Sequence, residues 1–190
     1  YGANTFSASR SEKAVDVSAI QSISSFLEKL REKVGTIDAV INTSGIMFRE
    51  EFALSSYQKI QEMVDTNYMG TINVALMSRQ HLLHSQGCLI NFSSSSYTRG
   101  RSLYAVYSST KAAVVNISQA LSEEWQEDGI RVHCICPERT DTPMRIQNFG
   151  VETPSTLLSP DAVARKTLQT LLLPETGLSV GVKLRLDEKN

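Results

Sequence analysis

Short apolar runs alternate with longer amphipathic stretches along most of this chain. The apolar runs indicate buried strands at 4–8, 37–41, 88–92, 130–136 and 178–186. The stretches with apolar residues three or four positions apart indicate helices at 18–34, 57–84, 103–127 and 159–173. The segment 137–160, which contains Pro143, Pro154 and Pro160, is predicted to be an irregular loop. Strands and helices that alternate in this way predict a doubly wound α/β domain on a parallel sheet.

Polar or glycine-containing segments follow four of the predicted strands. They are Ser9-Arg10, Asn42 to Gly45, Ser93 to Ser96, and Pro137 to Thr142. Open parallel sheets bind their ligands beyond the carboxyl ends of the strands. We therefore expect a binding site at that edge of the sheet.

The strongest candidate chemistry lies in the predicted helix 103–127. Tyr107 and Lys111 are four residues apart, so they share one helix face at about 5–6 Å between Cβ atoms. An ammonium beside a phenol favours the phenolate and should lower the tyrosine pKa below its usual value of ~10. Interconverting an alcohol and a ketone requires such a proton donor and acceptor. Ser94 precedes Tyr107 by 13 residues (107 − 94) and Asn67 precedes it by 40 (107 − 67).

Composition excludes several other classes of protein. The 190 residues are 41% hydrophobic and 21% charged with a formal net charge of −1, which gives no reason to expect nucleic acid or an anionic membrane as a partner. No apolar run approaches the ~18 residues of a membrane helix. Three cysteines suit a reducing cytoplasm, and Cys134 and Cys136 alternate with Ile135 as in a buried strand. We expect no metal site, and we expect His81 and His84 to be solvated at a helix end.

Together these residues resemble the short-chain dehydrogenase/reductase family over essentially the whole chain, 1–190. The matching pieces, in the family's order, are Asp16-Val17, Asn42 to Gly45, Asn67, Ser94, Tyr107-x-x-x-Lys111, and Pro137 to Thr142 with Pro143-Met144. The resemblance implies a Rossmann-like fold and a catalytic set of Asn67, Ser94, Tyr107 and Lys111. In isolation, Ser94 could instead be a loop residue or a helix cap, and Asn67 a solvated helical residue.

The resemblance also implies a role for each catalytic residue. Tyr107 would protonate the alkoxide as hydride arrives, and Lys111 would lower the Tyr107 pKa and bind the nicotinamide ribose. Ser94 would donate a hydrogen bond to the substrate carbonyl oxygen, where charge develops. Asn67 would hold a water that links Lys111 to solvent as a proton relay.

The same resemblance places a nicotinamide dinucleotide. Besides Tyr107 and Lys111, the cofactor-binding residues that it implies are Ser9, Arg10, Asp16, Val17, Asn42, Ser44, Gly45, Pro137, Thr140 and Thr142. NAD-preferring members usually carry an acidic residue where this chain has Ser9, hydrogen-bonded to the ribose 2′-hydroxyl. A hydroxyl followed by Arg10 suits a 2′-phosphate, so we expect NADP(H). An ordinary surface arginine is the alternative.

Four arginines should lie around the substrate pocket: Arg99, Arg101, Arg139 and Arg145. Guanidinium groups bind phosphate bidentately, which favours an anionic substrate, although pairing with Glu138, Asp141 or surface carboxylates explains them equally well. The strings 93–101, 107–115 and 137–145 resemble more narrowly the reductase domain of bacterial bifunctional ribitol-5-phosphate cytidylyltransferase/ribulose-5-phosphate reductase enzymes. That resemblance implies reduction of ribulose 5-phosphate. A reductase of an uncharged or thioester-bound ketone is the alternative.

One family element is missing from the 190 residues. The glycine-rich turn Thr-Gly-x-x-x-Gly-x-Gly, the first strand and the first helix would precede the predicted strand 4–8. We expect an incomplete record of a longer enzyme, with a fused upstream domain conceivable; a noncatalytic, partner-binding remnant of the fold is the other interpretation. The helices 57–84 and 103–127 resemble those that pair between subunits in the family, which implies a homo-oligomer.

Overall fold

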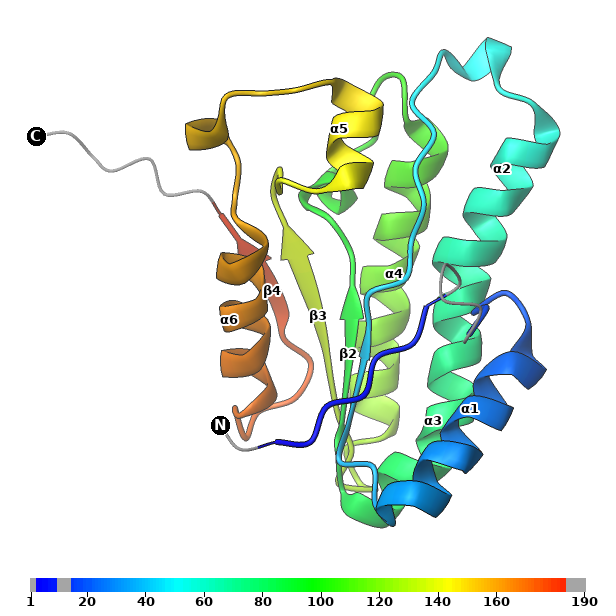
Figure 1. Ribbon diagram of the computed structural model, residues 1–190, viewed down its shortest axis with the longest axis vertical. Helices are drawn as coiled ribbons and strands as arrows, with labels where there is room; N and C mark the ends of the chain where they lie inside the picture. The colour runs from blue at the N-terminus through cyan, green and yellow to red at the C-terminus, as the bar shows by residue number, and fades with distance from the viewer. Residues whose placement is uncertain (1–2, 10–14, 184–190) are drawn as a thin grey trace, which may run out of the picture.

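The protein is built on one parallel sheet, seen in a computed structural model that describes residues 3–9 and 15–183 (Figure 1). Its strands are β1 (Ala39–Asn42), β2 (Cys88–Phe92), β3 (Arg131–Pro137) and β4 (Ser179–Val182), adjacent in that order. All three strand pairs are parallel, and Ile41 pairs with Ile90. The predicted parallel α/β architecture is therefore confirmed.

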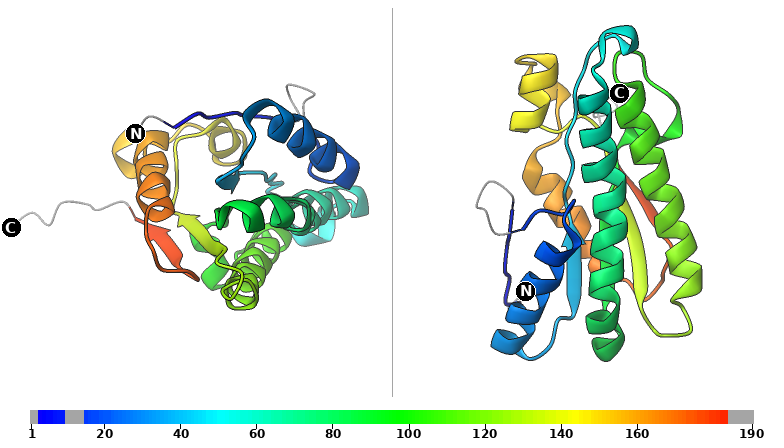
Figure 2. Two further views of the ribbon diagram at one scale, coloured as in Figure 1. Left: turned by 90° about the horizontal axis from the view of Figure 1, so that it is seen from below. Right: turned by 90° about the vertical axis from the view of Figure 1, so that its right-hand side faces the viewer.

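Helices cover both faces of the sheet (Figure 2). The long helices are α1 (Ile20–Val34), α2 (Tyr57–Val64), α3 (Gly70–Ser85), α4 (Ala105–Glu124) and α6 (Pro160–Leu171). Strand residues alternate between the two faces. Val132 joins a core with α1 and α3, while Ile135 joins a second core with α6. This alternation accounts for the continuous apolar runs, because a strand covered on both faces has no solvated side.

Two elements differ from the sequence prediction. Residues 4–8 form no strand: they pair with none of the four described strands, and residues 3–7 are exposed. The predicted loop 137–160 contains a short helix, α5 (Pro143–Phe149), and a single 3₁₀ turn at Pro154–Thr156. Thr142 caps α5, since its hydroxyl accepts the Arg145 N–H at 3.2 Å, and Pro143 suits the first helical position.

The predicted helix 57–84 is interrupted by a π-helical turn. Asp65–Met69 carries this wider turn between α2 and α3, and the Gly70 N–H donates to the Asp65 carbonyl. A π turn inserts one extra residue into a helix and is frequent at functional sites. Nearer the end of α3, His81 is buried rather than solvated, which corrects that expectation, whereas His84 is exposed.

The amino end of the sheet is tightly closed. The Ser85 hydroxyl donates to the Ile37 carbonyl at 2.8 Å, and the Arg131 guanidinium donates to the carbonyls of Leu171 and Leu173, both at 2.7 Å. A Cβ on Gly87 would lie 2.5 Å from the Asp38 carbonyl oxygen, so no side chain fits there. Backbone groups at this end are thus satisfied by the protein itself.

The three cysteines are free and buried, as predicted for small apolar residues. Burial raises the pKa of the Cys88 thiol to about 11. Within residues 3–9 and 15–183, no His, Cys, Asp and Glu side chains gather into a group of three suited to a metal ion. No helix of this part of the chain is long and apolar enough to cross a membrane.

Candidate active site

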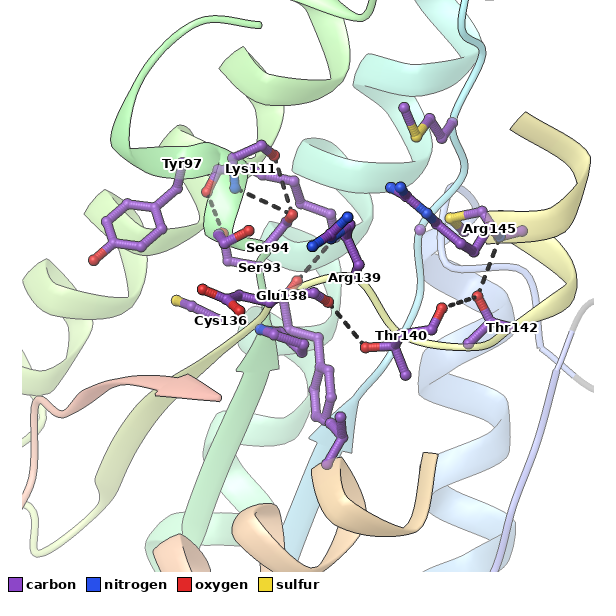
Figure 3. Close-up of a pocket in the computed structure, with 18 of the residues that line it drawn as sticks. Ser93, Ser94, Tyr97, Lys111, Cys136, Glu138, Arg139, Thr140, Thr142 and Arg145 are labelled. Carbon is purple, nitrogen blue, oxygen red and sulfur yellow. Dashed lines mark hydrogen bonds between the residues drawn. The ribbon is translucent and has the colours of Figure 1, made fainter. Parts of the chain in front are cut away.

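A pocket of about 1050 Å³ opens at the carboxyl end of the sheet. It is lined by the ends of β1, β2 and β3, by the first turn of α4, and by α5. Figure 3 shows side chains that line this pocket. One group, from the end of β2 and from α4, includes Ser93, Ser94 and Lys111; the other, from the loop after β3 and from α5, includes Glu138, Arg139, Thr140, Thr142 and Arg145. The sequence-predicted location of the site, beyond the strand ends, agrees with this pocket.

Lys111 is buried at the floor of the pocket, where α4 packs against β2 and β3. Its ammonium donates to the Phe92 carbonyl at 2.9 Å. Burial lowers the Lys111 pKa from its ordinary range to about 8. A Cβ on Gly45 would lie 3.1 Å from Lys111 Nζ, so the missing side chain gives the ammonium its room.

Asn67 lies in the π turn and is completely buried. Its amide oxygen accepts the Ile46 N–H at 2.8 Å, and its amide nitrogen donates to the Ile46 carbonyl at 3.0 Å and to the Thr110 hydroxyl at 3.1 Å. The side chain therefore ties the loop after β1 to α4, one residue before Lys111. Its amide groups are already used by protein partners, so the water relay predicted for Asn67 stays a prediction.

Tyr107 and Ser94 lie on the pocket wall beside Lys111. Burial raises the Tyr107 pKa above its ordinary value, while a hydrogen bond with the Ser94 hydroxyl works in the opposite direction. Lys111 Nζ lies 5.8 Å from the centre of the Tyr107 ring. Lys111 instead donates to the Phe92 carbonyl, so burial is the main influence on the Tyr107 pKa, and the predicted lowering by Lys111 stays a prediction. A phenol with a raised pKa is a proton donor at neutral pH.

Asn42 serves the interior of the protein rather than the pocket. Its amide nitrogen donates to the Thr71 hydroxyl and to the Asn91 amide oxygen, both at 3.3 Å. Its amide oxygen accepts the Ser44 hydroxyl at 2.6 Å and the Ser44 N–H at 3.2 Å. The side chain is thus occupied by protein partners, and a contact of Asn42 with the ribose stays a prediction. The neighbouring Ser44 and Gly45, also predicted for the cofactor, do line the pocket.

The predicted adenine-side residues lie outside the pocket. The Asp16 carboxylate accepts two hydrogen bonds from Ser18, one from its backbone N–H at 3.0 Å and one from its hydroxyl at 2.7 Å. These bonds form the turn before α1. The Val17 carbonyl accepts the Asn73 amide at 3.0 Å. Ser9 likewise is not a pocket residue, and Arg10 falls outside the described residues. Binding of a cofactor by these four residues stays a prediction.

The loop after β3 supplies the other wall. Pro137, Thr140 and Thr142 line the pocket, and their contact with a cofactor stays a prediction. Thr142 also caps α5, a role the Thr-Pro dipeptide could have revealed. Of the four predicted arginines, Arg101, Arg139 and Arg145 line the pocket. Arg99 does not: it follows the 3₁₀ turn Ser95–Thr98 in an extended conformation and is exposed, which corrects its assignment.

An aromatic and cationic cluster that the sequence did not reveal attaches α5 to the site. Phe149 lies at the end of α5, with the Arg145 guanidinium 3.6 Å and the Arg49 guanidinium 5.0 Å from its ring centre. The Phe149 and Tyr104 rings meet edge to face at 5.8 Å, and Tyr104 meets Tyr107 at 6.3 Å. The position of α5 is therefore coupled by ring contacts to Tyr107. No sequence period signals this cluster, because its members come from three separate segments.

Comparisons with known proteins agree with this geometry. A family model described as short chain dehydrogenase matches residues 4–151. A bifunctional ribulose 5-phosphate reductase/CDP-ribitol pyrophosphorylase, Bcs1 from Haemophilus influenzae, is 42% identical over 188 residues, which are 99% of this chain and 40% of that protein. A 3-oxoacyl-[acyl-carrier-protein] reductase from Chlamydia muridarum is 34% identical over 131 residues, 68% of this chain and 53% of that protein. This chain thus spans about half or less of either relative.

Solved structures of similar proteins share the fold. A gluconate 5-dehydrogenase from Burkholderia cenocepacia, in complex with NADP and tartrate, has a TM-score of 0.80 at 21% identity; the match covers 88% of this chain and 71% of that one. ElxO with NADP bound has a TM-score of 0.79 at 22% identity, covering 88% of this chain and 74% of that one. At such identities the similarity establishes the common fold.

Proposed function

Since this chain belongs to the short-chain dehydrogenase family, we propose that it forms part of an NADP-dependent reductase that interconverts a ketone and a secondary alcohol on a phosphorylated sugar. The proposed pair is D-ribulose 5-phosphate and D-ribitol 5-phosphate. The observation that carries the proposal is the 42% identity over 99% of the chain with a protein named as a ribulose 5-phosphate reductase. The similarity to a carrier-protein-dependent reductase is lower and covers only 68% of the chain.

The pocket residues suit the proposed chemistry. NADPH, when bound, supplies the hydride that the carbonyl carbon receives. Ser94 would donate a hydrogen bond to the carbonyl oxygen, and Tyr107, whose pKa is raised by burial, would give its proton to the developing alkoxide. Lys111 would place a positive charge beside the phenolate that remains, and Asn67 would keep the loop after β1 against α4.

The cofactor's nicotinamide half would lie along the wall formed by Gly45 and the loop after β3. Gly45 lines the pocket without a side chain, and Thr140 and Thr142 bring hydroxyl groups to the opposite wall. A wall of bare backbone facing hydroxyl groups suits a flat carboxamide-bearing ring and its ribose. Preference for NADP over NAD would depend on Ser9 and Arg10, at the adenosine end.

NADPH oxidation by the full-length protein tests this function. We expect turnover with D-ribulose 5-phosphate, much slower turnover with D-ribulose, and none with an acetoacetyl thioester. A preference for the thioester would replace the proposed substrate class while keeping the reductase. A folded protein that binds neither NADPH nor NADH would contradict the enzyme itself and favour the noncatalytic interpretation.

We also propose that the protein is a homo-oligomer through its long helices. Leu76 and Leu83 are 55% and 41% exposed, and their seven-residue spacing places them on one outer face of α3; Met69, the last residue of the π turn, is 41% exposed. Leu76→Glu should reduce the mass measured by sedimentation. Asn116→Glu, on an exposed position of α4, is a test of whether that helix shares the interface. A wild-type monomer would contradict this proposal.

A further inference from the structure

Positive charge dominates the walls of the pocket. Its charged lining residues are Arg101, Lys111, Arg139, Arg145 and Lys183, against a single carboxylate, Glu138. Lys111 donates to the Phe92 carbonyl and lies beside Tyr107, so we assign its charge to the proposed reaction. Besides the exposed Lys183, the three arginines are the groups available for a negatively charged ligand. Their partners distinguish the three.

Arg145 is already engaged in a bidentate ion pair. Its Nε and Nη2 atoms donate to the two carboxylate oxygens of Glu152, at 2.5 and 2.9 Å, and the guanidinium lies over the Phe149 ring. The Arg145 charge also lowers the Glu152 pKa below its ordinary range. A bidentate ion pair stacked on a ring leaves little of this guanidinium for a ligand. Arg145 thus holds α5 to the segment that follows it.

Arg101, unlike Arg145, has a buried side-chain donor without a partner in the described structure. Its Nε is buried and has no hydrogen-bond partner in the described structure, although the residue lines the pocket. A buried N–H without an acceptor destabilises the folded protein, because it has lost its hydrogen bond to water. Its backbone is fixed, since the Arg101 N–H donates to the Ser108 hydroxyl at 3.3 Å, one residue beyond Tyr107. An unsatisfied donor on a fixed backbone beside the reacting groups indicates a partner supplied by a ligand.

Arg139 approaches from the other wall. Its carbonyl accepts the Leu158 N–H at 2.8 Å, and the next residue, Thr140, bridges to Leu158 as well, which fixes the backbone. Its guanidinium forms no ion pair among the described residues and acts on Glu152 only through longer-range attraction. In Figure 3, Arg139 lies between the Ser94 group and the Thr140–Thr142 group.

We propose that Arg101 and Arg139 form the anion subsite that binds the phosphate of a phosphorylated ketose, and that Arg145 is a structural residue of α5. This inference rests on the proposed function. Cofactor pyrophosphate is the other phosphate source with the same chemistry. Arg101 follows Ser94 and precedes Tyr107 along the chain and contacts the first turn of α4, on the side of the pocket where the carbonyl must lie, so the substrate is the source that its position favours.

The test uses the full-length protein and the variants Arg101→Met, Arg101→Lys, Arg139→Met and, as the exposed control outside the pocket, Arg99→Met. Arg101→Met should raise KM for D-ribulose 5-phosphate about tenfold to 100-fold, because a charge-assisted bidentate contact is lost. Arg139→Met should act in the same direction. Arg101→Lys should keep part of the affinity, since it retains the charge but not the planar fork. Arg99→Met should leave both KM and kcat for D-ribulose 5-phosphate unchanged.

Two further readouts identify the anion. The Kd of NADPH, measured by fluorescence, should be unchanged in Arg101→Met, which also shows that the variant is folded. The kcat/KM for D-ribulose should change less than about threefold. Weakened NADPH binding with unaltered preference for the phosphorylated ketose would assign the arginines to the cofactor and overturn the inference. An unchanged KM in both Met variants would overturn it as well.

The anion subsite can be tested even if the proposed reaction is not observed. If the wild type reduces no phosphorylated ketose, calorimetric titration of D-ribitol 5-phosphate into the NADP-bound protein still tests the subsite. Binding that Arg101→Met abolishes would keep the anion subsite while the proposed reaction fails. No binding to the wild type would overturn both.

Discussion

The two ends of the parallel sheet treat their polar groups differently. At the amino end, Ser85 and Arg131 donate to backbone carbonyls of neighbouring elements, and Gly87 leaves no space. At the carboxyl end, Lys111 is buried with a single hydrogen bond and Arg101 has a buried donor without a partner. The carbonyls named at the amino end are satisfied by the protein alone, although His133 Nε2 and Ser179 Oγ, within β3 and β4, are also buried without a partner in the described structure. The carboxyl end keeps groups that cost stability until a ligand meets them, which is the expected cost of a functional site.

The comparison predicts that mutations at the two ends separate activity from stability. Tyr107→Phe, at the carboxyl end, should reduce kcat/KM of the full-length reductase about 10²- to 10⁴-fold, because it removes the proton donor and keeps the ring packing. The melting temperature should stay within the scatter of the control Tyr57→Phe, whose side chain is 76% exposed. Turnover near the wild-type rate would contradict the assigned role of Tyr107.

Gly87→Ala should show the opposite pattern at the amino end. Its Cβ would lie 2.5 Å from the Asp38 carbonyl oxygen, so the free energy of unfolding should fall by about 3 kcal/mol. Specific activity per folded molecule should be retained, because the residue is remote from the pocket. Gly100→Ala, where nothing lies within 4 Å of the added Cβ, is the matched control in denaturant titrations. Equal stability of the two variants would contradict the claim that this end is closed.

Lys111→Met should abolish turnover and yet stabilise the ligand-free protein. Burial lowers the Lys111 pKa from 10.5 to about 8, so charging it in the folded state is unfavourable, and the variant should gain about 2 kcal/mol at neutral pH. Between pH 8 and 10.5 the unfolded wild type binds more protons than the folded one, so wild-type stability rises with pH and the gap closes. Denaturant titrations across that window measure the gap. A variant less stable than wild type at neutral pH would contradict this account.

His133, which is buried in β3 and does not line the pocket, should give the smallest effect. Burial lowers its pKa from 6.5 to about 4, so the unfolded chain binds more protons between these values. Wild-type stability should therefore fall by about 1 kcal/mol from about pH 7.5 to about pH 5.5. In His133→Leu this contribution should be missing from the pH profile of unfolding. Parallel profiles for the two proteins would show that His133 is protonated at little cost when folded.

Sequence reasoning reached the fold and the pocket position of Ser94, Tyr107 and Lys111 through local patterns and a resemblance. The strands at 88–92 and 130–136 and the helices beside them follow from periodicity, since burial on both faces leaves an uninterrupted apolar run. The position of Ser94, Tyr107 and Lys111 at one pocket follows from their place after strands and at the start of a helix. The family membership that the resemblance implied is confirmed by the matching family model.

Other features depend on contacts that no local pattern encodes. The segment 4–8, predicted as a strand, pairs with none of the described strands, and α5 escaped notice because its prolines suggested a loop although Thr142-Pro143 is a helix start. The protein partners of Asn42, which are Thr71 and Asn91, are distant from it in sequence. The raised pKa of Tyr107 depends on burial, which spacing alone cannot give.

The π turn at Asp65–Met69 fixes the rotational phase of the helix that continues from α2 into α3. Each residue of an α-helix turns the chain by about 100°, so the one extra residue rotates everything after it by that amount. With this insertion, Asn67 faces inward while Leu76 and Leu83 face outward. Deleting one residue from the turn would leave a regular α-helix. In that helix either Asn67 would no longer face inward, or Leu76 and Leu83 would no longer face outward. The single inserted residue therefore sets two directions at once: that of Asn67 into the protein and that of Leu76 and Leu83 out of it.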